Sequence, residues 1–106
     1  MAKAGADIVG ANCLFDPWIN LETVRKMKVA LDAFNMSPFL MSQPNAYRCP
    51  DCGPFGWLSL PEFPYGWSPL TQLATLILPP AAIEPRQITR YEVKQWAREA
   101  YNLGIR

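Results

Sequence analysis

The sequence predicts an α/β fold in which two parallel strands are joined by a helix, and a second helix follows a long irregular segment. Short apolar runs flank a stretch with helical periodicity over residues 24–34, and a capping box begins a helix at Thr89. Ten of the eleven prolines lie between Pro38 and Pro85. Because proline lacks an amide hydrogen, this middle stretch is neither regular helix nor central strand. The regular elements are therefore expected near the two ends of the chain.

Two short apolar runs are expected to form the strands. The first is Asp7–Asn12, with Ile8 and Val9 at its centre, and the second is Phe39–Ser42, closed by Gln43-Pro44. A helix between two strands is typical of a parallel pair with a right-handed crossover. Since two strands do not make a stable sheet, the chain is expected to be a fragment of a larger domain.

The first helix is expected to begin at Asn20, a candidate N-cap, with Glu22 in the first turn facing the positive end of the helix dipole. Asn35 is expected to end it before Pro38. Its apolar face contains four residues at helical spacing, namely Val24, Met27, Leu31 and Phe34.

The second helix follows the irregular segment, which is expected to run from Asn45 to Pro85. Thr89 and Glu92 form a Thr-x-x-Glu capping box, and Gly104 is a suitable residue to follow the last turn. The apolar face of this helix is expected to comprise Val93, Trp96, Ala97, Ala100 and Leu103.

Composition excludes several classes of partner. The chain has 106 residues and a formal net charge of +1 with mixed signs, which predicts binding neither to nucleic acid nor to an anionic membrane. The longest apolar stretch, Leu70–Ile83, is interrupted by Pro79-Pro80 and is too short to span a bilayer. Three cysteines without a secretory signal favour a reducing, cytoplasmic location. Because the chain has no histidine, any metal must be held by thiolates and carboxylates.

The cysteines allow three interpretations. Cys13, directly after the first strand, is either a small buried hydrophobe or a metal ligand at the carboxyl end of a barrel strand. Cys49-x-x-Cys52-Gly53 has the spacing of a zinc knuckle, but a structural zinc site needs four ligands and the chain has no second pair. A catalytic zinc needs three protein ligands, of which Cys13 could supply one.

A series of longer motifs runs through the chain in order: Lys3-Ala4-Gly5-Ala6, Gly10-Ala11-Asn12-Cys13, Phe15-Asp16-Pro17, Leu40-Met41-Ser42-Gln43-Pro44, Leu60-Pro61-Glu62-Phe63-Pro64-Tyr65-Gly66, Glu84-Pro85-Arg86 and Arg98-Glu99-Ala100-Tyr101-Asn102-Leu103-Gly104. Together they resemble the homocysteine S-methyltransferase family, and the later ones its betaine-using members. The resemblance covers residues 3–66 and 83–106.

The resemblance implies a fold, a metal and a site residue. The family fold is a (β/α)8 TIM barrel of about 250 residues, so residues 1–106 would be a partial homocysteine-binding domain, from about the sixth strand through the seventh helix. In the family, the cysteine that matches Cys13 binds catalytic zinc. The other two ligands are an adjacent Cys-Cys pair after the eighth strand, which this chain does not contain. We therefore expect the isolated chain to be inactive, and its barrel-facing apolar surface to cause self-association.

The resemblance also implies the reaction, which is methyl transfer from betaine to zinc-bound homocysteine, giving methionine and dimethylglycine. An alternative of a different class stays open, namely a small non-enzymatic zinc-binding or interaction module that uses Cys13, Cys49 and Cys52.

Three departures from the family pattern stand out. Leu14 replaces a histidine and Cys49 replaces a hydroxyl residue. Residues 67–82 have no family counterpart and are interpreted as a non-family insertion, an unspliced or wrongly joined segment of a truncated gene product.

Overall fold

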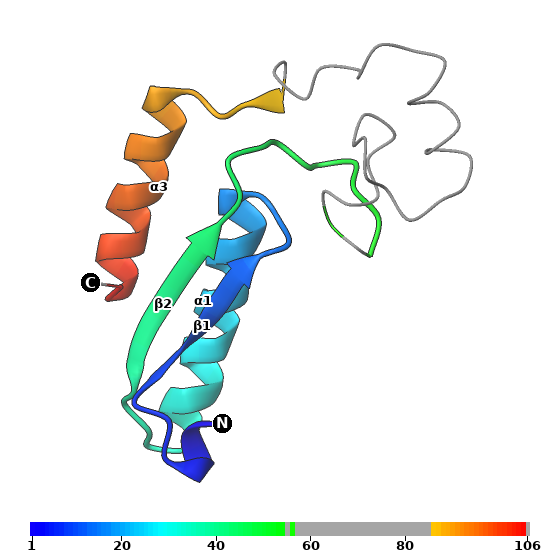
Figure 1. The fold of residues 1–106 in the computed structure, drawn as a ribbon. Coiled ribbons are helices and arrows are strands. Elements are labelled where there is room, and N and C mark those ends of the chain that lie inside the picture. Colours follow the sequence, from blue (N-terminus) through cyan, green and yellow to red (C-terminus); the bar gives the residue numbers. More distant parts are fainter. Residues whose placement is uncertain (55, 57–85, 106) are drawn as a thin grey trace.

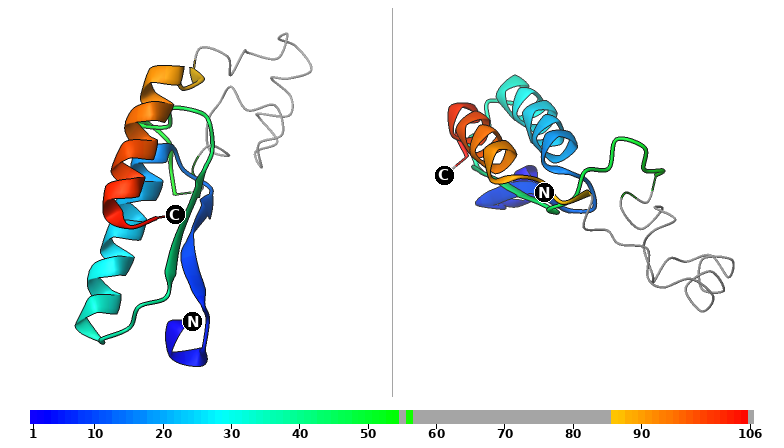
Figure 2. Two further views of the ribbon diagram at one scale, coloured as in Figure 1. Left: turned by 90° about the vertical axis from the view of Figure 1, so that its left-hand side faces the viewer. Right: turned by 90° about the horizontal axis from the view of Figure 1, so that it is seen from above.

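The computed structural model describes residues 1–54, 56 and 86–105. Along the chain the elements are a short 3-10 helix η1 (Ala2–Ala4), strand β1 (Ile8–Cys13), helix α1 (Pro17–Ala33), strand β2 (Phe39–Pro44) and helix α3 (Arg90–Leu103). Helices α1 and α3 lie side by side over one face of the sheet (Figures 1 and 2). The expected α/β class and element order are confirmed.

Strands β1 and β2 are parallel, as expected, and pair in register from Ile8 opposite Phe39 to Cys13 opposite Pro44. Gly10 makes this pairing possible, because a Cβ atom at this position would lie only 2.1 Å from the carbonyl oxygen of Met41. The two backbones approach too closely there for any side chain.

Helix α1 begins earlier than the sequence analysis predicted. Its N-cap is Asp16, whose side chain accepts hydrogen bonds from the amides of Trp18 and Ile19, and Pro17 occupies the first helical position. Proline is favoured there because its missing amide hydrogen would have no partner in the helix. The prediction of Asn20 as N-cap was therefore wrong.

Asn20 instead lies buried in the first turn of α1. Its side-chain oxygen accepts a hydrogen bond of 2.7 Å from the hydroxyl of Ser42, which is also buried. This bond joins α1 to β2 and satisfies two polar groups that would be costly to bury alone.

The apolar face of α1 is confirmed only in part. Leu21 and Val24 are almost fully buried, but Phe34 is 61% exposed and the ammonium group of Lys3 lies 4.1 Å from its ring centroid. Phe34 is the C-cap of α1, so it lies past the part of the helix that contacts the sheet. Asn35 adopts a left-handed conformation with φ of 53°, which confirms the predicted end of the helix.

Helix α3 has the predicted ends. The side chains of Thr89 and Glu92 form both bonds of the capping box, and Gly104 has a φ of 98°. The predicted apolar face is wrong at Val93 and Ala97, which are exposed. Within the described residues α3 packs mainly on α1, so only a narrow stripe around Ala100 is buried.

Of the irregular segment that was expected over 45–85, the structure describes residues 45–54 and 56. Tyr47 forms an antiparallel bridge with Gln87, so the start of this segment lies against the residues that lead into α3. The predicted insertion at 67–82 lies outside the described residues. In the described part of the chain, no helix is long and apolar enough to cross a membrane.

Candidate functional site

The carboxyl ends of β1 and β2 lie at the same end of the sheet as the start of α1 and the segment that follows β2 (Figure 1). Cys13 is the last residue of β1 and is exposed. Its φ of 58° is left-handed, which is uncommon for a residue with a side chain. The amide of Leu14 donates a 2.9 Å hydrogen bond to the carbonyl of Asn12, so Cys13 is the middle residue of a tight turn.

Asp16 connects this turn to its surroundings. Asp16 is buried, with 6% of the residue exposed. One oxygen accepts hydrogen bonds from Trp18 and Ile19 at 3.0 and 2.9 Å, and the other accepts the amide of Cys49 at 3.2 Å. Three backbone amides therefore compensate the buried charge. They hold the start of α1 and the segment after β2 in one arrangement.

The segment after β2 packs directly behind residues 13–16. The amide of Asn45 donates to the carbonyl of Phe15 at 3.2 Å. Gly56 has a φ of 61°, and a Cβ atom there would lie 1.8 Å from the carbonyl oxygen of Leu14. A residue with a side chain could adopt neither this conformation nor this contact without moving the backbone.

Two bidentate ion pairs hold the same segment, one to the first turn of α3 and one to the residues that precede this helix. Arg48 binds Glu92 at 2.8 and 2.6 Å, and Arg86 binds Asp51 at 2.7 and 2.9 Å. The hydrogen bonds from Arg48, together with those from Thr89, lower the pKa of Glu92 to about 2. The hydrogen bonds from Arg86 likewise lower the pKa of Asp51. Both carboxylates are therefore charged at neutral pH.

Cys49 and Cys52 are less exposed to solvent than Cys13. Cys49 is fully buried, and burial raises the pKa of its thiol to about 11. Burial also raises the pKa of Cys52. Among the described residues no group of three cysteine, aspartate or glutamate side chains could hold a metal ion. The structure therefore does not form the three-thiolate module from Cys13, Cys49 and Cys52.

Of the three cysteines, all of which lie in the described residues, Cys13 is the exposed one. It is an exposed thiol at the carboxyl end of a parallel strand, which is where the active sites of barrel enzymes lie. As a thiolate it would fit one position of a zinc site. It is one donor, and the described residues place no further pair of donors beside it.

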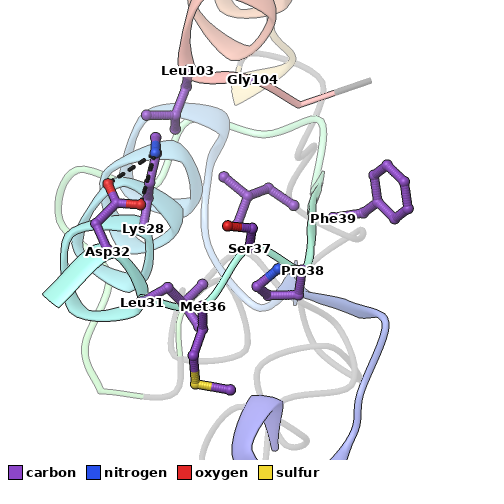
Figure 3. A pocket seen from close by; sticks show the side chains of 10 residues that line it. Lys28, Leu31, Asp32, Met36, Ser37, Pro38, Phe39, Leu103 and Gly104 are labelled. Carbon is purple, nitrogen blue, oxygen red and sulfur yellow. Dashed lines mark hydrogen bonds and ion pairs between the residues drawn. The ribbon is translucent and has the colours of Figure 1, made fainter. Parts of the chain in front are cut away.

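A pocket lies at the opposite end of the sheet from Cys13 (Figure 3). It is lined by residues of the second half of α1, the start of β2 and the end of α3, among them Lys28, Asp32 and Leu103. Lys28 and Asp32 form an ion pair of 2.9 Å with each other. Its charged groups are thus already paired, and it lies far from Cys13 along the strands.

Asp16, Arg48 and Arg86 were not predicted from the sequence to support the site. Asp-Pro ahead of a helical run is an N-cap signature that could have identified Asp16. No sequence pattern indicates the two arginine pairs, because each joins residues at least 35 positions apart.

Comparison with known proteins gives matches that cover the whole of this chain but only part of each relative. The chain is 48% identical over all of its length to betaine–homocysteine S-methyltransferase 1 of Mus musculus and 49% identical to that of Bos taurus, covering 22% of each. It is 42% identical to S-methylmethionine–homocysteine S-methyltransferase of Mus musculus, covering 25% of that relative. No family model matches the chain. The resemblance seen in the motifs is confirmed, and the chain spans about a fifth of the length of the curated relatives it matches.

Proposed function

We propose that this chain is one part of a homocysteine S-methyltransferase, and that β1, α1, β2 and α3 are neighbouring elements of its (β/α)8 barrel. The observation that carries the proposal is the 48% identity over the whole chain to a betaine–homocysteine S-methyltransferase. The parallel strand–helix–strand unit supports it, because such barrels are built from repeats of this unit.

Within this proposal Cys13 is one ligand of a catalytic zinc ion, whose other protein ligands come from elsewhere in the barrel. Its exposure and its place after β1 support the assignment. When bound, zinc would favour the thiolate form of homocysteine, which is the nucleophilic form. Asp16 would hold the turn that carries Cys13, through its bonds to the start of α1 and to Cys49.

The proposed acceptor is homocysteine, which the names of all the matched relatives above share. The proposed donor is betaine, because the relatives with the higher identities are named for it. Methyl transfer from betaine would give methionine and dimethylglycine. S-methylmethionine is the second candidate donor, supported by the relative at 42% identity. Both donors carry the methyl group on a cationic centre, which makes it a good target for a thiolate.

We further propose a cytoplasmic location. The three cysteines are free thiols, which fits a reducing compartment.

A chimera tests the proposal. This chain would replace the segment of the mouse betaine enzyme with which it aligns, and methyl transfer to homocysteine would be measured with each donor. We expect a zinc-containing chimera that is active with betaine. Cys13→Ser should remove zinc and activity together, because a serine hydroxyl does not ionise to a ligand comparable with a thiolate. Cys52→Ser is the matched control and should retain both.

A folded chimera without zinc, or one in which Cys13→Ser retains its zinc, would contradict the assignment of Cys13. Circular dichroism and gel filtration would establish folding. The isolated 106-residue chain is expected to transfer no methyl group in the same assay, because its described residues supply one candidate ligand where a catalytic zinc needs three.

A further inference from the structure

We propose that Cys49 and Cys52 form a dithiol site that reacts with small disulfides, such as glutathione disulfide, to give an intramolecular disulfide. This inference does not rest on the proposed methyltransferase function. It concerns the Cys-x-x-Cys motif of Cys49 and Cys52, which has no role in the proposed zinc site at Cys13.

The backbone brings the two thiols together. The amide of Cys52 donates a 3.3 Å hydrogen bond to the carbonyl of Cys49, which closes a turn over residues 49–52. Each of the two thiols is among the groups that act on the pKa of the other, as expected for side chains that share one turn. Gly53 pairs with Gly56 directly after the turn. Two cysteines at the ends of one closed turn need little rearrangement of the backbone to form a bond between the two sulfurs.

Cys49 is held in place from three sides. Its amide donates to Asp16 at 3.2 Å, its thiol donates to the carbonyl of Tyr47 at 3.6 Å, and the side-chain amide of Asn45 donates to its sulfur at 3.9 Å. A fixed, buried thiol is poorly accessible to a reagent from solvent but well placed to attack a neighbour.

The difference in exposure sets the order of reaction. Cys52 is half-buried and Cys49 is fully buried, so the Cys52 thiolate attacks the glutathione disulfide first and one glutathione thiolate leaves. Cys49 then loses its proton and attacks the Cys52 sulfur of the mixed disulfide, and the second glutathione thiolate leaves. One disulfide bond is broken and one formed. The two protons of the cysteines pass to the two glutathione thiolates, directly or through water.

Cys13 is outside this pair. The pair lies behind residues 13–16, because Asp16 holds the amide of Cys49 and Gly56 packs against Leu14. Oxidation would therefore occur in the segment that supports this turn, without consuming the Cys13 thiol.

The test is equilibration of the wild-type chain in buffers of reduced and oxidised glutathione, followed by acid quenching, alkylation, trypsin digestion and mass spectrometry. Cleavage after Arg48 leaves both cysteines of the pair in one peptide and Cys13 in another. We expect that peptide to lose two hydrogens and to resist alkylation, while Cys13 stays alkylated. Because the fold holds the two cysteines in one closed turn, the equilibrium constant should be at least about tenfold larger in buffer than in 6 M guanidinium.

Single variants test the order of attack. With Cys49→Ser, the mixed disulfide of Cys52 with glutathione should accumulate, because no second thiol displaces it. With Cys52→Ser, modification of Cys49 should be much slower. Equal constants in buffer and in guanidinium, a bridge that includes Cys13, or equally fast modification of Cys49 in the Cys52→Ser variant would overturn the proposal.

Discussion

The two faces of the β1–β2 sheet differ sharply. On the α1 side, Val9, Leu21 and Val24 are buried, and the Asn20–Ser42 hydrogen bond joins helix to strand. On the other side, Ile8 is 59% exposed and Phe39 is 71% exposed. The same two strands thus have one completed interface and one apolar face that the described residues leave uncovered. A local strand–helix–strand unit can pack one side of a sheet by itself, whereas covering the other side requires further elements.

The largest expected effect comes from Gly10→Ala, which breaks the sheet that both faces share. The added Cβ would lie 2.1 Å from the Met41 carbonyl oxygen, which is backbone and cannot move aside alone. We expect a loss of about 3 kcal/mol in the free energy of unfolding, measured by urea denaturation. Gly5→Ala is the control, since a Cβ there meets no atom within 4 Å and only the strain of its φ of 87° remains. Equal losses in both variants would contradict the close-approach argument.

Asp16→Ala acts on the α1 side of the sheet and is expected to lower the free energy of unfolding by about 2 kcal/mol. The reason is that the amides of Trp18, Ile19 and Cys49 lose their acceptor. Thr89→Ala removes the N-cap of α3 and should cost about 1 kcal/mol, without disturbing residues 13–16. Hydrogen exchange distinguishes the two variants, because the Cys49 amide should exchange faster in Asp16→Ala and not in Thr89→Ala. Unchanged exchange of that amide in Asp16→Ala would show that the carboxylate does not hold the segment.

Phe39→Ser tests the sheet face that the described residues leave uncovered. Since Phe39 is 71% exposed, the substitution should change the stability of the single chain by less than about 0.5 kcal/mol. It should weaken the self-association that the uncovered apolar face predicts, and sedimentation velocity measures this. Tyr91→Ser is the matched control, because Tyr91 is equally exposed at 69% but lies on α3. If both variants, or neither, altered association, the sheet face would not be the associating surface.

The smallest effect is a pH dependence. The pKa of Glu92 is about 2 in the folded chain, below its ordinary value of 4.5. Its stabilising contribution is therefore complete above about pH 4.5 and is lost as pH falls toward 2. Urea midpoints measured across this range should fall less steeply for Glu92→Gln than for the wild type. An unchanged slope would mean that the Arg48–Glu92 pair does not persist in solution.

Sequence alone determined the α/β class, the order of the elements, the capping box of α3 and the close of α1 at Asn35. These depend on interactions within a few residues of one another, so composition and periodicity report them directly. Its place after an apolar strand left Cys13 open between a small hydrophobe and a metal ligand, and the resemblance to the methyltransferase family made it the candidate ligand.

Only the tertiary structure decided which polar residues hold the site together. Asn20 bonds to Ser42 instead of capping a helix, and Asp16 binds an amide 33 residues away. Cys49 is buried and protonated rather than poised to bind metal. Arg48 and Arg86 have partners that no local pattern indicates. The physical reason is that a polar side chain takes whichever acceptor or donor the fold brings near it, and burial, which sets its pKa, is a property of the assembled neighbours.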